Sequence, residues 1–157
     1  IFFTEPIASG QLLFMINLPA MKMMRWIAIL TAGLVLGSCF FPWVTIPSKG
    51  IVISGFESTI TDYGKPGVFH SFFCGIYILF MLLYKLWSLR AAFFISAFNI
   101  AWAVRNFVLI SACRGGECPQ KEPALYLVLA GSLTLTLVIF FIRVDNKIRQ
   151  VSESRIY

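Results

Sequence analysis

The chain has 157 residues, of which 59% are hydrophobic and 13% charged, and its mean hydropathy is +0.83. A soluble domain of this size could not bury so much apolar surface, so the composition excludes a soluble enzyme or a separate catalytic domain. The formal net charge of +6 does not indicate nucleic-acid binding, because the basic residues flank apolar stretches and form no basic face on a soluble domain. The sequence predicts an integral membrane protein whose first partner is the lipid bilayer.

Residues 1–25 precede the first long apolar stretch. Their apolar residues are too few and too interrupted to cross a bilayer, so we expect a segment at the membrane interface or against a neighbour. Four stretches of roughly 20 residues follow, the length that crosses a hydrocarbon core. They predict an all-α membrane protein, a four-transmembrane-helix bundle over 26–142, with spans at 26–46, 68–84, 91–112 and 124–142 and a basic tail at 143–157.

The first span also has features of a secretion signal. The segment 21–39 has a basic start, an apolar run and the sequence Leu36-Gly37-Ser38-Cys39, which resembles a bacterial lipoprotein signal with a lipidated cysteine. The apolar run continues past Cys39 into Phe40 and Phe41. This continuation favours an uncleaved helix.

Basic residues are distributed unevenly between the two sides. Four Lys or Arg residues fall in the loops 47–67 and 113–123, whereas eight flank the other ends of the spans: Lys22, Arg25, Lys85, Arg90, Arg143, Lys147, Arg149 and Arg155. Cytoplasmic flanks are enriched in Lys and Arg. The sequence therefore predicts that both termini are cytoplasmic (N-in/C-in), and we expect a bacterial inner membrane.

The first outer loop contains two β-prone runs. Residues 43–46 and 51–55 lie on either side of Pro47-Ser-Lys-Gly50, which supplies turn residues, so a small β-hairpin is predicted. A lone hairpin is marginally stable and needs a packing partner. Four spans, two inner termini and a β-containing first outer loop resemble the claudin-like tetraspan layout in topology. The claudin signature of a Gly-Leu-Trp segment followed by paired cysteines is missing from this loop, so the resemblance implies no residue roles.

The four cysteines fall into two pairs. Cys113 and Cys118 bracket Arg-Gly-Gly-Glu in an outer loop, which predicts a disulfide in an oxidising exterior, with free thiols as the alternative. Cys39 and Cys74 lie in apolar stretches, where we expect small packing residues rather than a second disulfide. Four-helix quinone-linked thiol oxidases carry a reactive Cys-x-x-Cys, which this sequence lacks, so thiol oxidation is not expected.

The third span carries the most polar side chains. Asn99, Trp102 and Asn106 recur at helical spacing, and Arg105 lies about 10 Å below the expected outer end of the span at Ala112. A charge at that depth needs a partner. We expect this partner to be an acid of the outer loop, such as Glu57 or Asp62, or carbonyl groups, or an external group: an anionic lipid, a quinone, a substrate or another subunit.

Two further features concern the first and second spans. Gly33 and Gly37 form a Gly-x-x-x-Gly pattern, which allows close helix packing within one chain or between chains. His70, near the outer end of the second span, is expected to be an interfacial residue bonded to a neighbour, with a haem or chlorophyll axial ligand as the alternative. A single histidine and scattered cysteines give no metal-ligand spacing.

The sequence contains no recognisable catalytic constellation. We therefore expect a non-enzymatic accessory or scaffolding subunit of a larger membrane complex, with other membrane-protein subunits as partners and with no cofactor, metal or nucleic acid. The alternative is a small binding or carrier protein that holds an anionic lipid, a quinone or another ligand near Arg105, Asn106 and Asn99.

Overall fold

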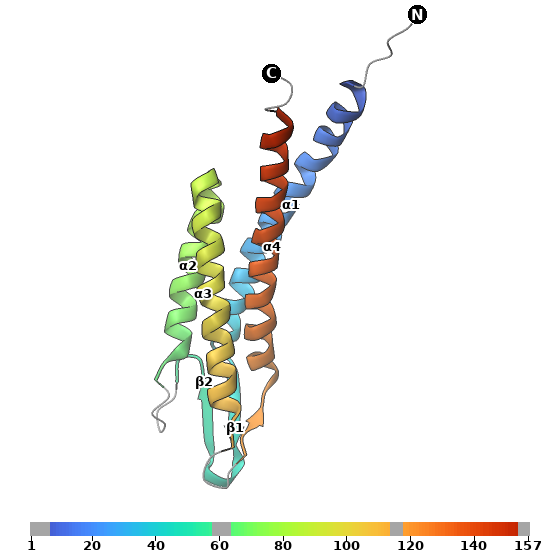
Figure 1. The fold of residues 1–157 in the computed structure, drawn as a ribbon. Helices are drawn as coiled ribbons and strands as arrows, with labels where there is room; N and C mark the ends of the chain where they lie inside the picture. Colours follow the sequence, from blue (N-terminus) through green and yellow to red (C-terminus); the bar gives the residue numbers. More distant parts are fainter. Residues whose placement is uncertain (1–6, 58–63, 114–117, 154–157) are drawn as a thin grey trace, which may run out of the picture.

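Four long helices form an elongated bundle that carries a small β-sheet at one end (Figure 1). The computed structural model describes the backbone of residues 7–57, 64–113 and 118–153, and the side chains of 21–57, 64–113, 118–144 and 146. We call the end that carries the β-sheet the sheet end. We call the opposite end, where the second helix turns into the third, the turn end. The helices are α1 (Ile7–Ser38), α2 (Pro66–Leu83), α3 (Leu86–Ser111) and α4 (Pro123–Glu153); the strands are β1 (Pro42–Ile46), β2 (Ile51–Ser54) and β3 (Gln120–Lys121).

Each helix contains a stretch long and apolar enough to cross a membrane. α2, with 18 residues, is about 27 Å long, close to the ~30 Å of a hydrocarbon core. The prediction of four membrane-spanning helices is confirmed on length and composition, with stretches at Met21–Ser38, Pro66–Leu83, Leu86–Ser111 and Pro123–Val144.

The first span differs from its predicted bounds of 26–46. α1 ends at Ser38, and Pro42–Ile46 forms strand β1. Pro42 cannot continue a helix, and the β-branched residues after it favour a pleated strand. At the other end, residues 7–25, predicted as a separate interfacial segment, continue α1; residues 1–6 lie outside the described part.

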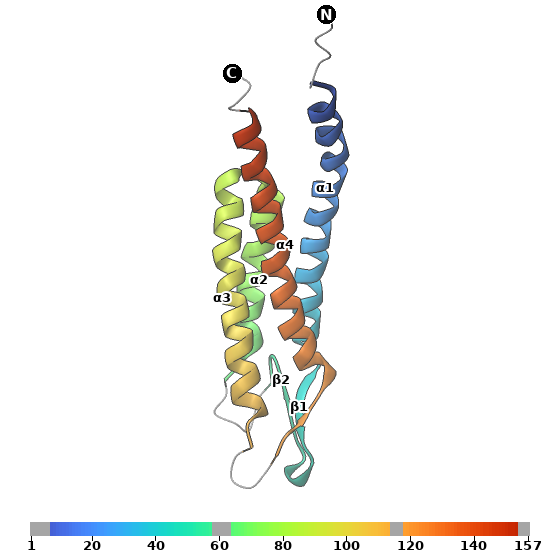
Figure 2. The same cartoon turned by 45° about the vertical axis from the view of Figure 1, so that its right-hand side comes forward.

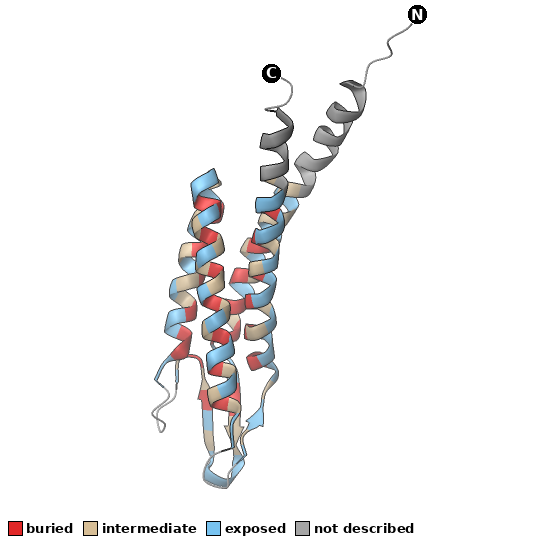
Figure 3. Cartoon of the chain, viewed as in Figure 1, coloured by how far each residue is buried: buried red, intermediate tan, exposed pale blue. Residues whose placement is uncertain are grey.

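The four helices pack in the cyclic order α1, α4, α3, α2 (Figure 2). Along each helix, buried residues are interspersed with exposed ones, as expected for a helix with one packed side (Figure 3). α1 and α4 approach each other closely at Gly131, where an added Cβ atom would come within 2.5 Å of Cγ2 of Val35. In a bilayer, such small-residue contacts substitute for the hydrophobic driving force that water would supply.

The turn end is tighter than the sequence indicated. Only Tyr84 and Lys85 separate α2 from α3, because residues 86–90, predicted as loop, already belong to α3. Tyr84 has φ 47°, the left-handed conformation common at helix C-termini. Arg25 of α1 donates from Nη2 to the carbonyl oxygen of Leu82 at 2.9 Å, and its guanidinium lies 5.1 Å from the Tyr84 ring centroid. Arg25 therefore caps α2 and ties it to α1.

At the sheet end, the predicted hairpin is present and has a third strand. The strand order is β2-β1-β3, both pairings are antiparallel, and Thr45 lies opposite Val52 on one side and Gln120 on the other. β3 comes from the α3–α4 connection and was not predicted. It supplies the additional pairing that a lone hairpin needs for stability.

Helix α3 extends past the other helices onto this sheet. The indole Nε1 of Trp102 donates to the carbonyl oxygen of Pro66 at 3.1 Å, so Trp102 is level with the first residue of α2. The remaining residues of α3, 103–111, add about two and a half turns beyond that level. Ala103 and Ile110 on these turns are buried against the sheet and the start of α4. The sheet and the end of α3 form a cap with its own apolar core.

Two glycines fasten this cap to the bundle. The N–H of Gly55, just after β2, donates to the carbonyl oxygen of Cys39 at 3.0 Å, and the N–H of Gly67 donates to the carbonyl oxygen of Gly55 at 2.6 Å. A Cβ atom at either glycine would lie 2.7 Å from the backbone of the next segment in this stack. The end of α1, the end of the hairpin and the start of α2 are therefore in direct backbone contact.

We predict that Gly67→Ala destabilises the protein by about 1–3 kcal/mol, because the added methyl group overlaps the Gly55 backbone. Gly75→Ala is the matched control: Gly75 lies on the same helix, and a Cβ atom there meets nothing within 4 Å. The control should unfold at the parent temperature or slightly above it, since alanine favours helix. The measurement is the thermal unfolding midpoint in detergent, and equal midpoints for the two variants would contradict the prediction.

Candidate functional site

A chain of buried polar side chains crosses the bundle near the sheet end. Nδ1 of His70 on α2 lies 2.7 Å from Oδ1 of Asn99 on α3, and Nδ2 of Asn99 donates to Oγ of Ser132 on α4 at 3.0 Å. All three side chains are at most 1% exposed. Because an amide oxygen only accepts, His70 carries its proton on Nδ1. The chain links three helices through their side chains.

The surroundings of His70 are closed. The ring of Trp43, from strand β1, meets it edge-on at a centroid distance of 5.9 Å, and the second ring nitrogen, Nε2, is buried with no hydrogen-bond partner in the described part of the chain. The residues described contain no group of three or more His, Cys, Asp or Glu side chains that could hold a metal. His70 is bonded to a neighbour, Asn99, as expected, and its place at the membrane interface stays a prediction.

Other polar groups between the helices are also engaged. Thr136 of α4 donates to the carbonyl oxygen of Ser96 on α3 at 3.2 Å, and the Tyr77 hydroxyl of α2 donates to the carbonyl oxygen of Leu135 on α4 at 3.3 Å. Asn106 is buried, and its Nδ2 donates to the carbonyl oxygen of Trp102 at 2.9 Å. These bonds satisfy the groups and hold neighbouring turns together.

Arg105 occupies a different environment from the one predicted. Its side chain is exposed, and its guanidinium lies 4.8 Å from the ring centroid of Trp102. Since Trp102 is level with the first residue of α2, Arg105 lies about 4.5 Å beyond that level, where Trp and Arg are common at membrane boundaries. The predicted depth of Arg105, about 10 Å below Ala112, stays a prediction.

The predicted binding residues are not brought together. Asn99 and Asn106 face the interior and Arg105 faces outward, so the three do not form one pocket. Glu57 is exposed at the end of the hairpin, where its N–H donates to Oγ of Ser54 at 3.1 Å. Asp62 lies outside the described residues, so its pairing with Arg105 stays a prediction.

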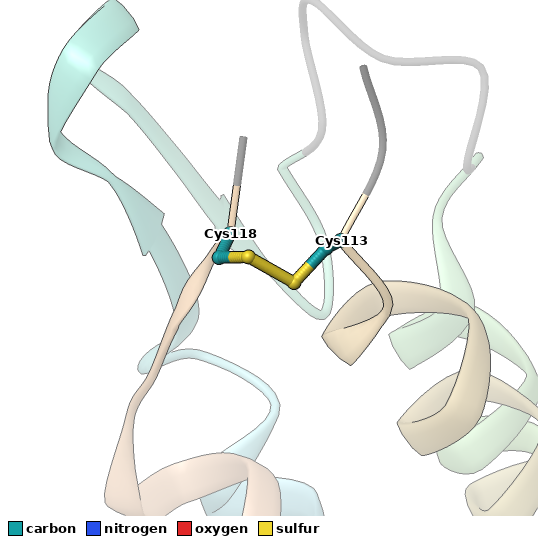
Figure 4. The surroundings of a disulfide bond; sticks show 2 residues. All are labelled: Cys113 and Cys118. Atoms are coloured by element: carbon teal, nitrogen blue, oxygen red, sulfur yellow. A yellow bond between two sulfur atoms is a disulfide. The ribbon is translucent and has the colours of Figure 1, made fainter. Parts of the chain in front are cut away.

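The cysteines follow the predicted pairing. Cys113 and Cys118 form a disulfide with an S–S distance of 2.15 Å and a Cα–Cα distance of 4.3 Å (Figure 4). This bond ties the end of α3 to the segment that leads into β3. Cys39 and Cys74 are free and buried, and burial raises the pKa of the Cys39 thiol to about 12. Cys39 is therefore protonated and unreactive at neutral pH.

An apolar groove of about 690 Å³ lies between α1 and α4 at the sheet end. Gly33 and Gly37 line it, flanked by Leu30 and Leu34. A Cβ atom at either glycine would meet no neighbouring segment within 4 Å, so this Gly-x-x-x-Gly face is not packed by the described helices of its own chain. The sequence identified the two glycines but could not show which partner they face.

Glu122 lines the sheet end of the same groove and was not among the predicted residues. Its Oε1 accepts a hydrogen bond from the Thr45 hydroxyl at 3.2 Å, and its N–H donates to the carbonyl oxygen of Trp43 at 2.9 Å. The available sequence signal was an acid immediately before Pro123, at the start of an apolar span. Glu122 thus places one carboxylate beside the largely apolar surface of the groove.

Comparisons with protein-family models, with curated proteins and with solved structures find no match to this chain.

We predict that Asn99→Leu destabilises the protein by about 1–3 kcal/mol, because it leaves His70 and Ser132 buried without their shared partner. Replacing His70 by Leu as well should recover part of that loss, since it removes one of the unpaired groups. Unfolding midpoints of Asn99→Leu, His70→Leu and the double variant in detergent test this coupling. A double variant whose loss equals the sum of the single losses would show that the two side chains are not coupled.

Proposed function

We propose that this protein is a non-enzymatic accessory or scaffolding subunit of a larger membrane assembly and that it binds a transmembrane helix of another subunit along α1. The observation that carries the proposal is the open face at Gly33 and Gly37, which line the apolar groove and touch no other segment within 4 Å of a Cβ position. Paired small residues at this spacing let a second helix backbone approach closely.

The exposure of α1 supports this role. In its span, 22% of the residues are buried, against 33% in the spans of α2 and α4 and 28% in that of α3. Leu30 and Leu34 are 66% and 67% exposed and form the row next to the two glycines on α1. A partner helix that rests in the notch at the two glycines would contact both leucines, as knobs contact a hole in other helix pairs.

The use of the buried polar groups favours a scaffold over a catalyst or a carrier. Asn99 and Ser132 bond to each other at 3.0 Å and are 1% and 0% exposed, so they do not line an open path. Conduction and transport need polar groups that face water or substrate along a pathway. Here His70, Asn99 and Ser132 connect helices, as Tyr77 and Thr136 also do, which is what a rigid supporting subunit requires.

The orientation belongs to the same proposal. In this proposal the protein lies in a bacterial inner membrane, with the sheet end facing the exterior and both termini in the cytoplasm. This arrangement of the chain is claudin-like in topology. Arg25, Lys85 and Arg143 lie toward the turn end, as the preference of Lys and Arg for cytoplasmic flanks requires. The Cys113–Cys118 disulfide at the sheet end suits an oxidising compartment.

Cysteine labelling tests this orientation. Lys49→Cys in the hairpin turn and Lys85→Cys in the α2–α3 turn place exposed thiols at opposite ends. In intact cells, a membrane-impermeant maleimide should label the first variant and should label the second only after permeabilisation. The buried Cys39 and Cys74 make the parent protein the background control. The reverse labelling pattern would reject the proposed orientation.

Co-purification tests the accessory role. Gly33→Leu with Gly37→Leu fills the notch and should reduce recovery of partner subunits in mild detergent by about tenfold or more, because close backbone approach is lost. Gly75→Leu is the matched control, since Gly75 also has nothing within 4 Å of its Cβ position but lies on α2. The subunits are quantified by mass spectrometry against the parent. Equal recovery from all three proteins, or a parent that migrates alone, would contradict the proposal.

A further inference from the structure

Among the residues that the structure describes, the side-chain partner of Glu122 is neutral. Its half-buried side chain lines the α1–α4 groove, where Ile29, Leu30, Phe41 and Leu127 are among the other lining residues. The hydrogen bond to Oε1 comes from Thr45, a neutral hydroxyl, at 3.2 Å. A carboxylate beside apolar surface is costly unless a cation or several donors compensate it.

Two cations of the cap, Lys121 and Arg105, are directed to aromatic rings. The ammonium of Lys121, the preceding residue, lies 5.8 Å from the ring centroid of Phe107, and the guanidinium of Arg105 lies 4.8 Å from that of Trp102. Ser38, a polar lining residue at this end, donates its hydroxyl to the carbonyl oxygen of Val35 at 2.8 Å. The groove therefore presents a negative charge at its sheet end.

We infer that the partner helix carries a Lys or Arg residue at its sheet-end terminus and that this cation pairs with Glu122. The inference rests on the proposed function, since it names the chemistry of the helix that lies on α1. Glu122 directly precedes α4 and is therefore at the depth where a membrane helix ends. Basic residues are common at that depth in transmembrane helices.

The shape of the surface favours a helix over a lipid chain. Small residues four apart form a notch for another backbone, which an acyl chain does not need. The exposed stripe on α1 also continues toward the turn end through Leu30, Trp26 and Met23, which are 66%, 61% and 59% exposed. These positions recur at three- and four-residue spacing, so they lie on one side of α1 over the length of the span.

Two synthetic peptides test the pairing with the full-length protein in phosphatidylcholine vesicles. Each is a single-span Leu/Ala helix with a central Gly-x-x-x-Gly, and the two differ only in ending with Lys or with Gln at both termini. Binding is measured by energy transfer between labelled protein and labelled peptide. The Lys peptide should bind the parent about tenfold more tightly than the Gln peptide, the effect of one charge-assisted hydrogen bond.

Glu122→Gln should remove this difference, whereas Glu57→Gln, an exposed acid on the other side of the cap, should preserve it. Gly33→Leu with Gly37→Leu should abolish binding of both peptides. Equal affinity of the parent for the two peptides would overturn the inference about charge and leave the docking face intact. Binding of both peptides that survives the two leucines would instead reject the docking face. An amine-bearing phospholipid that co-purifies with the parent and is lost in Glu122→Gln, with neither peptide bound, would overturn the inference and assign the groove to lipid.

Discussion

The bundle depends on one buried side-chain amide, that of Asn99, whose donor and acceptor groups both need hydrogen-bond partners. Asn99 has a donor and an acceptor, and water is absent from the hydrocarbon core that its helix crosses. Its contacts with His70 and Ser132 fix α2, α3 and α4 in one relative register, since sliding any of them by a turn would break a bond. α1 lies outside this chain of bonds and is held by apolar packing, by the Gly131 contact and by Arg25. Three helices thus form the fixed core, and the fourth has the free surface.

The cap extends this arrangement beyond the membrane-spanning part. α3 reaches past the start of α2 and presents Ala103 and Ile110 to the sheet, while Gly55 stacks between the ends of α1 and α2. The cap is thereby joined to the bundle by backbone hydrogen bonds as well as by apolar packing. A surface built this way is stiff, which suits a subunit whose proposed role is to hold another helix in place.

Much of the architecture could be predicted from the sequence, because membrane spans are long, apolar and bounded by charges. The two β-prone runs, the short disulfide loop and the helical spacing of Asn99 and Asn106 were also readable locally. The extension of α3 past the first residue of α2 could not be predicted, since nothing in an apolar run marks where the neighbouring helix begins. β3 has two residues, too few for a periodic signal. The exposure of Gly33 and Gly37 depends on how α1 packs, which a single-chain pattern does not encode.

The strand order has a consequence for biosynthesis. β1 is the central strand, yet its neighbour β3 lies more than 70 residues later in the chain, beyond two membrane-crossing helices. A chain synthesised from its N-terminus therefore presents β1 and β2 as an incomplete sheet until α2, α3 and residues 120–121 have been made. Until then, one edge of β1 has unpaired N–H and C=O groups, which attract other strands. Completion of this small sheet thus requires that the two intervening helices have been made and have returned the chain to β1.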